Sequence, residues 1–90
     1  MALVKNINGS SDNNPPDGFD SWKEYWESRK GRRFSRCSNL SCSSAAEVGA
    51  HVKKAFGTNE WYIVPLCNSC NNPSNTDAFE VNASDLLRIR

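Results

Sequence analysis

One apolar stripe near the beginning of the chain has the spacing of a helix. Phe19, Trp22 and Trp26 recur at intervals of three and four residues, and Tyr25 widens the stripe they make. Side chains with this spacing lie on one side of a helix, so the pattern predicts an amphipathic helix over residues 20–30. Since the chain has few other large apolar groups, we expect the two tryptophans of this helix to pack into the core.

The predicted helix also carries start and stop signals. Asp20 or Ser21 is suited to the N-cap, and Glu24 follows Ser21 at the spacing of a capping box. The last turn is basic, which complements the negative end of the helix dipole. Gly31 follows it at the position where a left-handed residue commonly ends a helix.

Farther along, the apolar period changes from that of a helix to that of a strand. Apolar residues occupy every second position of residues 48–52, which predicts a strand with His51 on its opposite face. Residues 61–64, Trp-Tyr-Ile-Val, predict a second strand by their aromatic and β-branched content. Residues 57–59, Gly-Thr-Asn, predict a turn between them, so we expect a hairpin that ends at Pro65.

Polar sequence surrounds these elements. Residues 1–18 are rich in Asn, Ser, Pro, Gly and Asp, and we interpret them as a disordered tail that a turn-like Pro-Pro-Asp-Gly closes at residues 15–18. Residues 71–75 are either irregular or the opening of a short helix. Residues 79–81 predict a short strand, and residues 86–89 a final turn capped by the two residues before them.

The content of hydrophobic residues is low for a chain that folds by burial of apolar surface alone. It has 90 residues, enough for one domain, of which 38% are hydrophobic, and its mean hydropathy is −0.65. A domain this small has a thin core, so a metal or a covalent cross-link is expected to help stabilise it. The sequence shows no signal-peptide core and no apolar run of membrane-spanning length, which favours a cytoplasmic protein without a membrane.

Four cysteines supply the expected cross-link. They stand as Cys37-x4-Cys42 and Cys67-x2-Cys70, two close pairs separated by the predicted hairpin. Two disulfides or unpaired buried thiols are the alternatives, but thiols stay reduced in the cytosol and bind metal there. Paired cysteines at this spacing predict one structural zinc ion in a closed tetrahedral shell. His51 is a fifth possible ligand, although a Cys3His site would leave one cysteine unused.

The order of these elements resembles a known family. A cysteine knuckle, a hairpin and then Pro-Leu-Cys-x-x-Cys at a predicted helix start look like a treble-clef zinc finger, and more narrowly like the HNH endonuclease-like group. The matching segments are residues 32–37 with Cys42, residues 47–52 and residues 65–72. The resemblance implies a small α+β, zinc-bound treble-clef (ββα-like) domain, which we place at residues 19–90 with the amphipathic helix preceding the finger.

The catalytic part of that family's motif is degenerate here. His51 matches the general base, but Ala50 stands where an acid or a second His binds the catalytic metal in the family. Asn71 stands where another His is expected, and the family's middle Asn falls near Tyr62, with Asn59 the nearest upstream. A nuclease would therefore depend on His51 and Asn71, a poor ligand set for a catalytic metal. The resemblance thus favours a protein that is not an enzyme.

Basic residues suggest a partner for such a module. The chain has 11 Lys and Arg against 10 Asp and Glu, a balance that by itself indicates no partner. Most of the bases nevertheless cluster, which favours contact with the phosphates of DNA or RNA. A solvated face is the alternative. The candidate residues are Arg29, Lys30, Arg32, Arg33, Arg36, Lys53 and Lys54.

Three functions follow from these patterns. The preferred one is a zinc-stabilised binding module that contacts nucleic acid through the basic residues. The second is an HNH-like, metal-dependent endonuclease that uses His51. The third is a protein-interaction adaptor or inhibitor that acts through the Trp22 and Trp26 face or the C-terminal segment.

Overall fold

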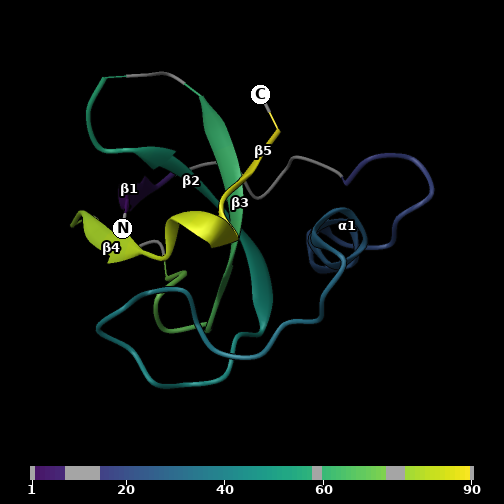
Figure 1. Ribbon diagram of the computed structural model, residues 1–90, viewed down its shortest axis with the longest axis horizontal. Coiled ribbons are helices and arrows are strands. Elements are labelled where there is room, and N and C mark those ends of the chain that lie inside the picture. The colour runs from purple at the N-terminus through teal and green to yellow at the C-terminus, as the bar shows by residue number, and fades with distance from the viewer. Residues whose placement is uncertain (1, 8–14, 58–59, 73–76, 90) are drawn as a thin grey trace.

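The computed structural model describes residues 2–7, 15–57, 60–72 and 77–89. In these residues the chain forms one α-helix and a five-stranded antiparallel sheet with the strand order β4-β1-β2-β3-β5 (Figure 1). The α+β class expected from the sequence is therefore confirmed. The elements are β1 (Ala2–Asn6), α1 (Trp22–Lys30), β2 (Val48–Lys54), β3 (Trp61–Leu66), β4 (Phe79–Val81), the 3-10 helix η2 (Ala83–Asp85) and β5 (Leu87–Arg88).

Helix α1 begins and ends at the predicted signals. The Ser21 hydroxyl accepts a hydrogen bond from the Glu24 N–H at 3.1 Å, and the Glu24 carboxylate accepts one from the Asp20 N–H at 3.1 Å. At the other end Gly31 adopts the left-handed conformation, with φ 70°, and its N–H donates to the Glu27 carbonyl. The capping groups satisfy backbone donors and acceptors that a helix terminus leaves open.

Strands β2 and β3 form the predicted hairpin, and their register runs from Val48 opposite Leu66 to Lys53 opposite Trp61. The expectation that the hairpin ends at Pro65 is wrong, because β3 continues through Leu66. The Pro65 carbonyl accepts the Ser38 N–H at 2.8 Å, so it points away from β2. The Pro65 nitrogen faces the same side, and the hairpin therefore loses no hydrogen bond to this proline.

The N-terminal segment corrects another expectation. Residues 2–6, assigned to a disordered tail from the sequence, form β1 between β2 and β4. Val4 is fully buried there, opposite Lys54 on one side and Phe79 on the other. A strand this short is stabilised by its neighbours' hydrogen bonds rather than by its own sequence. Residues 8–14 of the predicted tail lie outside the described residues.

The C-terminal segment agrees with the sequence in part. The strand predicted at residues 79–81 is confirmed as β4. The predicted final turn at residues 86–89 is wrong, because Leu87 and Arg88 form β5 and pair with Ile63 and Tyr62 on the free edge of β3. In residues 67–72 and 77–89 no α-helix follows the second cysteine pair, and residues 73–76 lie outside the described part of the chain. The treble-clef assignment is thus not confirmed.

The two faces of the β2–β3 hairpin pack against different parts of the chain. Ala50, Val52, Val64 and Leu66 are buried together with Cys37 and Cys67 in one core. Gly49 and His51, at the alternate positions of β2, face Trp22 of α1 instead. In Figure 1, α1 lies to the right of strands β2 and β3. The alternation of side chains along β2 thus separates a cysteine core from a helix-side core.

Gly49 allows α1 to approach β2 closely. A Cβ atom at this position would lie 2.8 Å from the carbonyl carbon of Trp22 and 2.9 Å from the backbone nitrogen of Lys23. We expect Gly49→Ala to reduce the free energy of unfolding by about 1–3 kcal/mol, as overpacking does. Denaturant titration measures this change in the free energy of unfolding. Lys53→Ala, an exposed position on the same face, is the control, and an equal effect there would contradict the close-approach argument.

Candidate metal centre

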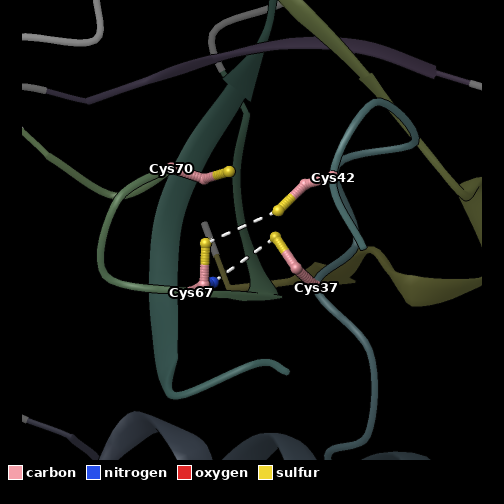
Figure 2. Close-up of side chains that lie close together, drawn as sticks. All are labelled: Cys37, Cys42, Cys67 and Cys70. Atoms are coloured by element: carbon pink, nitrogen blue, oxygen red, sulfur yellow. Dashed lines mark hydrogen bonds between the residues drawn. The ribbon is translucent and has the colours of Figure 1, made fainter. Parts of the chain in front are cut away.

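Four cysteine side chains converge from two segments of the chain (Figure 2). Cys37 and Cys42 lie in the connection between α1 and β2, whereas Cys67 follows β3 directly and Cys70 lies in the next turn. Their four Sγ atoms all lie within 4.8 Å of one another. The structure thus brings together all the metal ligands predicted from the sequence, from positions up to 33 residues apart.

The spacing of the sulfur atoms suits a metal ion better than disulfides. The Sγ atoms of Cys42 and Cys67 are 3.7 Å apart, and all four cysteines are free thiols. A tetrahedron with metal–sulfur distances of about 2.3 Å has sulfur–sulfur edges of about 3.8 Å. A disulfide would need about 2.05 Å. Four thiolates in this arrangement would fill the coordination shell and leave no position for water, so the centre fits a structural role.

Hydrogen bonds hold the cysteine turns in place. The backbone N–H of Cys67 donates to Cys37 Sγ at 3.4 Å, and the Asn39 side-chain amide donates to Cys70 Sγ at 3.5 Å. Both bonds run from one cysteine segment to the other. Because donors at a sulfur stabilise the thiolate form, they orient ligands and support metal binding.

Two residues outside the cysteine pairs anchor the second turn. The Glu47 carboxylate accepts hydrogen bonds from the backbone N–H of Asn68 at 3.0 Å and from its side-chain amide at 3.2 Å. Asn6 of β1 donates its side-chain amide to the Cys70 carbonyl at 2.9 Å. No sequence motif predicted that Asn6, Asn39 and Glu47 would hold the second cysteine turn. Only Asn39, inside the first cysteine pair, has a local signal that marks it.

The thiols differ in their affinity for protons. Hydrogen bonds from the backbone and hydroxyl of Ser44 lower the pKa of Cys42 to about 7. Burial raises the pKa of the Cys37 thiol, and burial together with the nearby Cys67 sulfur raises the pKa of Cys70 far above its usual range. A bound divalent cation reverses this penalty, because it favours the thiolate form of every ligand. Metal binding is therefore expected to release protons.

Comparisons with known proteins identify no relative: no family model, curated protein or solved structure matches this chain. Any functional assignment therefore depends on the chemistry of the site and of the surfaces around it.

His51 lies away from the metal centre. The residue is 8% exposed on the helix-side face of β2, and its ring centroid lies 4.8 Å from that of Trp22 and 6.1 Å from that of Trp61. Asn71, the other candidate for catalysis, lies in the second cysteine turn, where its N–H donates to the Cys67 carbonyl. Within the described residues, the four cysteines are the one group of three or more potential ligands with metal-binding geometry. The structure thus does not place His51 with Asn71 in a metal site, nor His51 among the cysteines.

The burial of His51 makes stability depend on pH. Its Nε2 has no hydrogen-bond partner, the Trp22 and Trp61 rings against it are uncharged, and exposed Lys53 adds positive charge along the same face. Burial lowers the pKa of His51 below its ordinary value of 6.5. As the pH falls, the unfolded chain therefore takes up a proton on His51 before the folded chain does. The contribution of neutral His51 to the free energy of unfolding is fully present above pH 6.5 and decreases as the pH falls below that value.

We expect the protein to lose at most about 1.4 kcal/mol of stability per pH unit through His51 below about pH 6.5. In His51→Phe, which cannot titrate, this contribution should disappear. Thermal unfolding of both proteins between about pH 7.5 and about pH 5.5 measures the difference, and any protonation of the cysteines affects both equally. Parallel profiles for the two proteins would contradict the prediction.

The basic candidates divide into separate groups. Arg29 and Lys30 lie in the last turn of α1, and Lys53 and Lys54 lie at the far end of β2. Gly49 lies against the first turn of α1, and Lys53 is four residues farther along β2, which is about 13 Å in a strand. The arginines that follow α1 lie instead beside the first cysteine pair. The seven candidates therefore come from three segments of the chain: the end of α1, the residues before Cys37 and the end of β2.

Arg32 has a structural partner that the sequence did not reveal. Its guanidinium lies 2.6 Å from the Asp85 carboxylate and 4.8 Å from the centre of the Trp26 ring. Asp85 is 9% exposed, and its second oxygen accepts the Ser38 hydroxyl at 2.7 Å. The pair joins the segment after α1 to η2 over 53 positions of sequence. No local pattern links such distant residues, which is why Asp85 was interpreted only as a cap.

Arg33 and Arg36 are differently placed. Both are exposed, and both line a pocket of about 260 Å³ beside Cys37. The ion pairs found in the described residues are Arg32–Asp85 and Arg88–Glu60, so neither Arg33 nor Arg36 has an acidic partner there. As for membranes, the described residues contain no helix with the length and apolar character needed to cross one.

Proposed function

We propose that this protein is a non-catalytic binding module, stabilised by one structural zinc ion at Cys37, Cys42, Cys67 and Cys70, that contacts DNA or RNA. The observation that carries the proposal is the pair of exposed residues Arg33 and Arg36, which lack acidic partners in the described residues and line one pocket with Cys37. Guanidinium groups match phosphate oxygens in geometry and charge.

The segment that carries these arginines is held at both ends. Arg32 is tied to Asp85, and Arg36 forms an isolated antiparallel bridge with Ala45 across the first cysteine pair. A metal at Cys37 would fix the middle of the same region. Less conformational entropy is then lost when the arginines bind a partner, because their backbone is already ordered.

The zinc assignment extends the observed cluster by the donor chemistry. Four thiolates with tetrahedral spacing are a ligand set typical of structural zinc. An intracellular location belongs to this proposal, since thiols remain reduced and available there. So does the treble-clef, HNH-like relationship, which is supported by the order of a cysteine turn, a hairpin and a second cysteine turn along the chain.

Fluorescence anisotropy with labelled single- and double-stranded DNA and with RNA tests the function. We expect binding at about 50 mM salt that weakens steeply as salt is added. In Arg33→Ala/Arg36→Ala the slope of log affinity against log salt should fall by about 1.8 for duplex DNA, as for two lost phosphate contacts. Lys23→Ala/Arg88→Ala removes the same net charge elsewhere and should change the slope less. If no nucleic acid binds at low salt, the proposed function is wrong.

A further inference from the structure

A pocket lies beside Cys37, next to the metal centre. It lies between the segment after α1, the end of β3 and the region of η2, and has a volume of about 260 Å³. Its lining combines Arg33 and Arg36 with the polar side chains of Ser35, Asn39 and Asn82. Pro65 and the partly exposed Leu40 add apolar surface. A small anion with an attached apolar group fits this chemistry.

The charges in the pocket lining leave a local excess of two positive charges. Asp85 and Arg32 neutralise each other, and the Asp85 oxygens already accept hydrogen bonds from Arg32 and from the Ser38 hydroxyl. Arg33 and Arg36 are the other two charged residues of the lining, and no acidic residue of the lining neutralises them. An anion that enters the pocket therefore meets two guanidinium groups, and the one carboxylate nearby is already bound.

We propose that this pocket binds the terminal phosphate monoester of a nucleic-acid strand. This inference rests on the proposed function and specifies its ligand. A phosphate monoester carries about −1.5 to −2 charges at pH 7, which matches the two guanidinium groups. An internal phosphodiester carries only one charge. It must also continue along the backbone in both directions, which suits an open groove better than a pocket of this size.

Each part of the pocket has a role in this complex. Arg33 and Arg36 pair with the phosphate oxygens, where charge-assisted hydrogen bonds are roughly twice as strong as neutral ones. Ser35 and Asn82 offer neutral polar groups around the same space, and Leu40 offers apolar contact to the terminal nucleoside. The rest of the strand extends out of the pocket. The pocket is therefore expected to distinguish a phosphorylated strand end from an internal phosphodiester.

The test uses one single-stranded sequence of about 12 nucleotides in three forms: with a 5′-phosphate, with a 3′-phosphate, and with hydroxyl groups at both ends. We expect one phosphorylated form to bind the zinc-loaded protein at least about tenfold more tightly than the hydroxyl form. The gain should disappear in Arg33→Ala/Arg36→Ala and persist in Lys23→Ala/Arg88→Ala. Zinc content and circular dichroism establish that both double variants are folded.

Other outcomes separate the two proposals. Equal binding of all three forms, with a loss in Arg33→Ala/Arg36→Ala, would overturn the terminal-phosphate site and leave the proposed function standing. A complete lack of binding would overturn both. Competition by millimolar inorganic phosphate against the phosphorylated form alone would support the site. Tighter binding of a phosphoserine peptide than of any oligonucleotide would overturn the assignment to nucleic acid.

Discussion

Replacing Cys67 with alanine is expected to unfold the protein. Cys67 is buried, its Sγ lies 3.7 Å from that of Cys42, and its N–H donates to Cys37 Sγ. A structural zinc supplies on the order of 10 kcal/mol of apparent folding free energy. That is comparable with the entire stability of a typical domain, about 5–15 kcal/mol. Chelation of the wild-type protein should have the same effect, and circular dichroism, amide NMR spectra and elemental analysis measure both.

A matched control lies in the same turn. Ser69 is exposed between Cys67 and Cys70 and contributes no sulfur, so Ser69→Ala should keep one zinc per chain and change stability by no more than about 0.5 kcal/mol. In the native protein all four thiols should be protected from thiol reagents until the metal is removed. A metal-free wild-type protein that unfolds cooperatively, or sulfurs oxidised in pairs, would contradict the metal-centre assignment.

The second large effect is expected at Trp26. Its side chain is 1% exposed, lies edge-on to Phe34 at 5.2 Å and donates its indole N–H to the Asp85 carbonyl at 2.8 Å. Trp26→Ala removes the largest fully buried side chain in the described residues. We expect the free energy of unfolding to fall by about 3–5 kcal/mol, since truncating a buried aromatic leaves a cavity. Denaturant titration of the variant measures the loss.

Two further variants separate packing from hydrogen bonding and from simple loss of an aromatic ring. Trp26→Phe keeps most of the packing but leaves the Asp85 carbonyl without its indole donor, and should cost about 1–3 kcal/mol. Phe56→Ala truncates a ring that is 80% exposed and should have almost no effect. If Trp26→Ala and Phe56→Ala were equally stable, the buried role of Trp26 would be wrong.

The sequence determined the elements whose signals are local. Ser21, Glu24 and Gly31 predicted the ends of α1 closely, because caps act within one turn of the helix. The alternation in β2 and the β-branched run in β3 predicted the hairpin for the same reason. The cluster of the four cysteines was also predictable, since paired cysteines at this spacing lie on turns that can present them to one ion.

Tertiary structure decided the features whose stabilising partners are distant in sequence. Strand β1 exists because β2 and β4 supply its hydrogen bonds, and Pro65 remains within β3 because its nitrogen faces away from β2. Asp85 is bound to a guanidinium 53 residues earlier. His51 is buried because Gly49, on the same face of β2, lets α1 pack closely. Contacts between distant segments produce no periodic pattern in the sequence of either segment. Only the folded chain therefore shows which residues are held by such contacts.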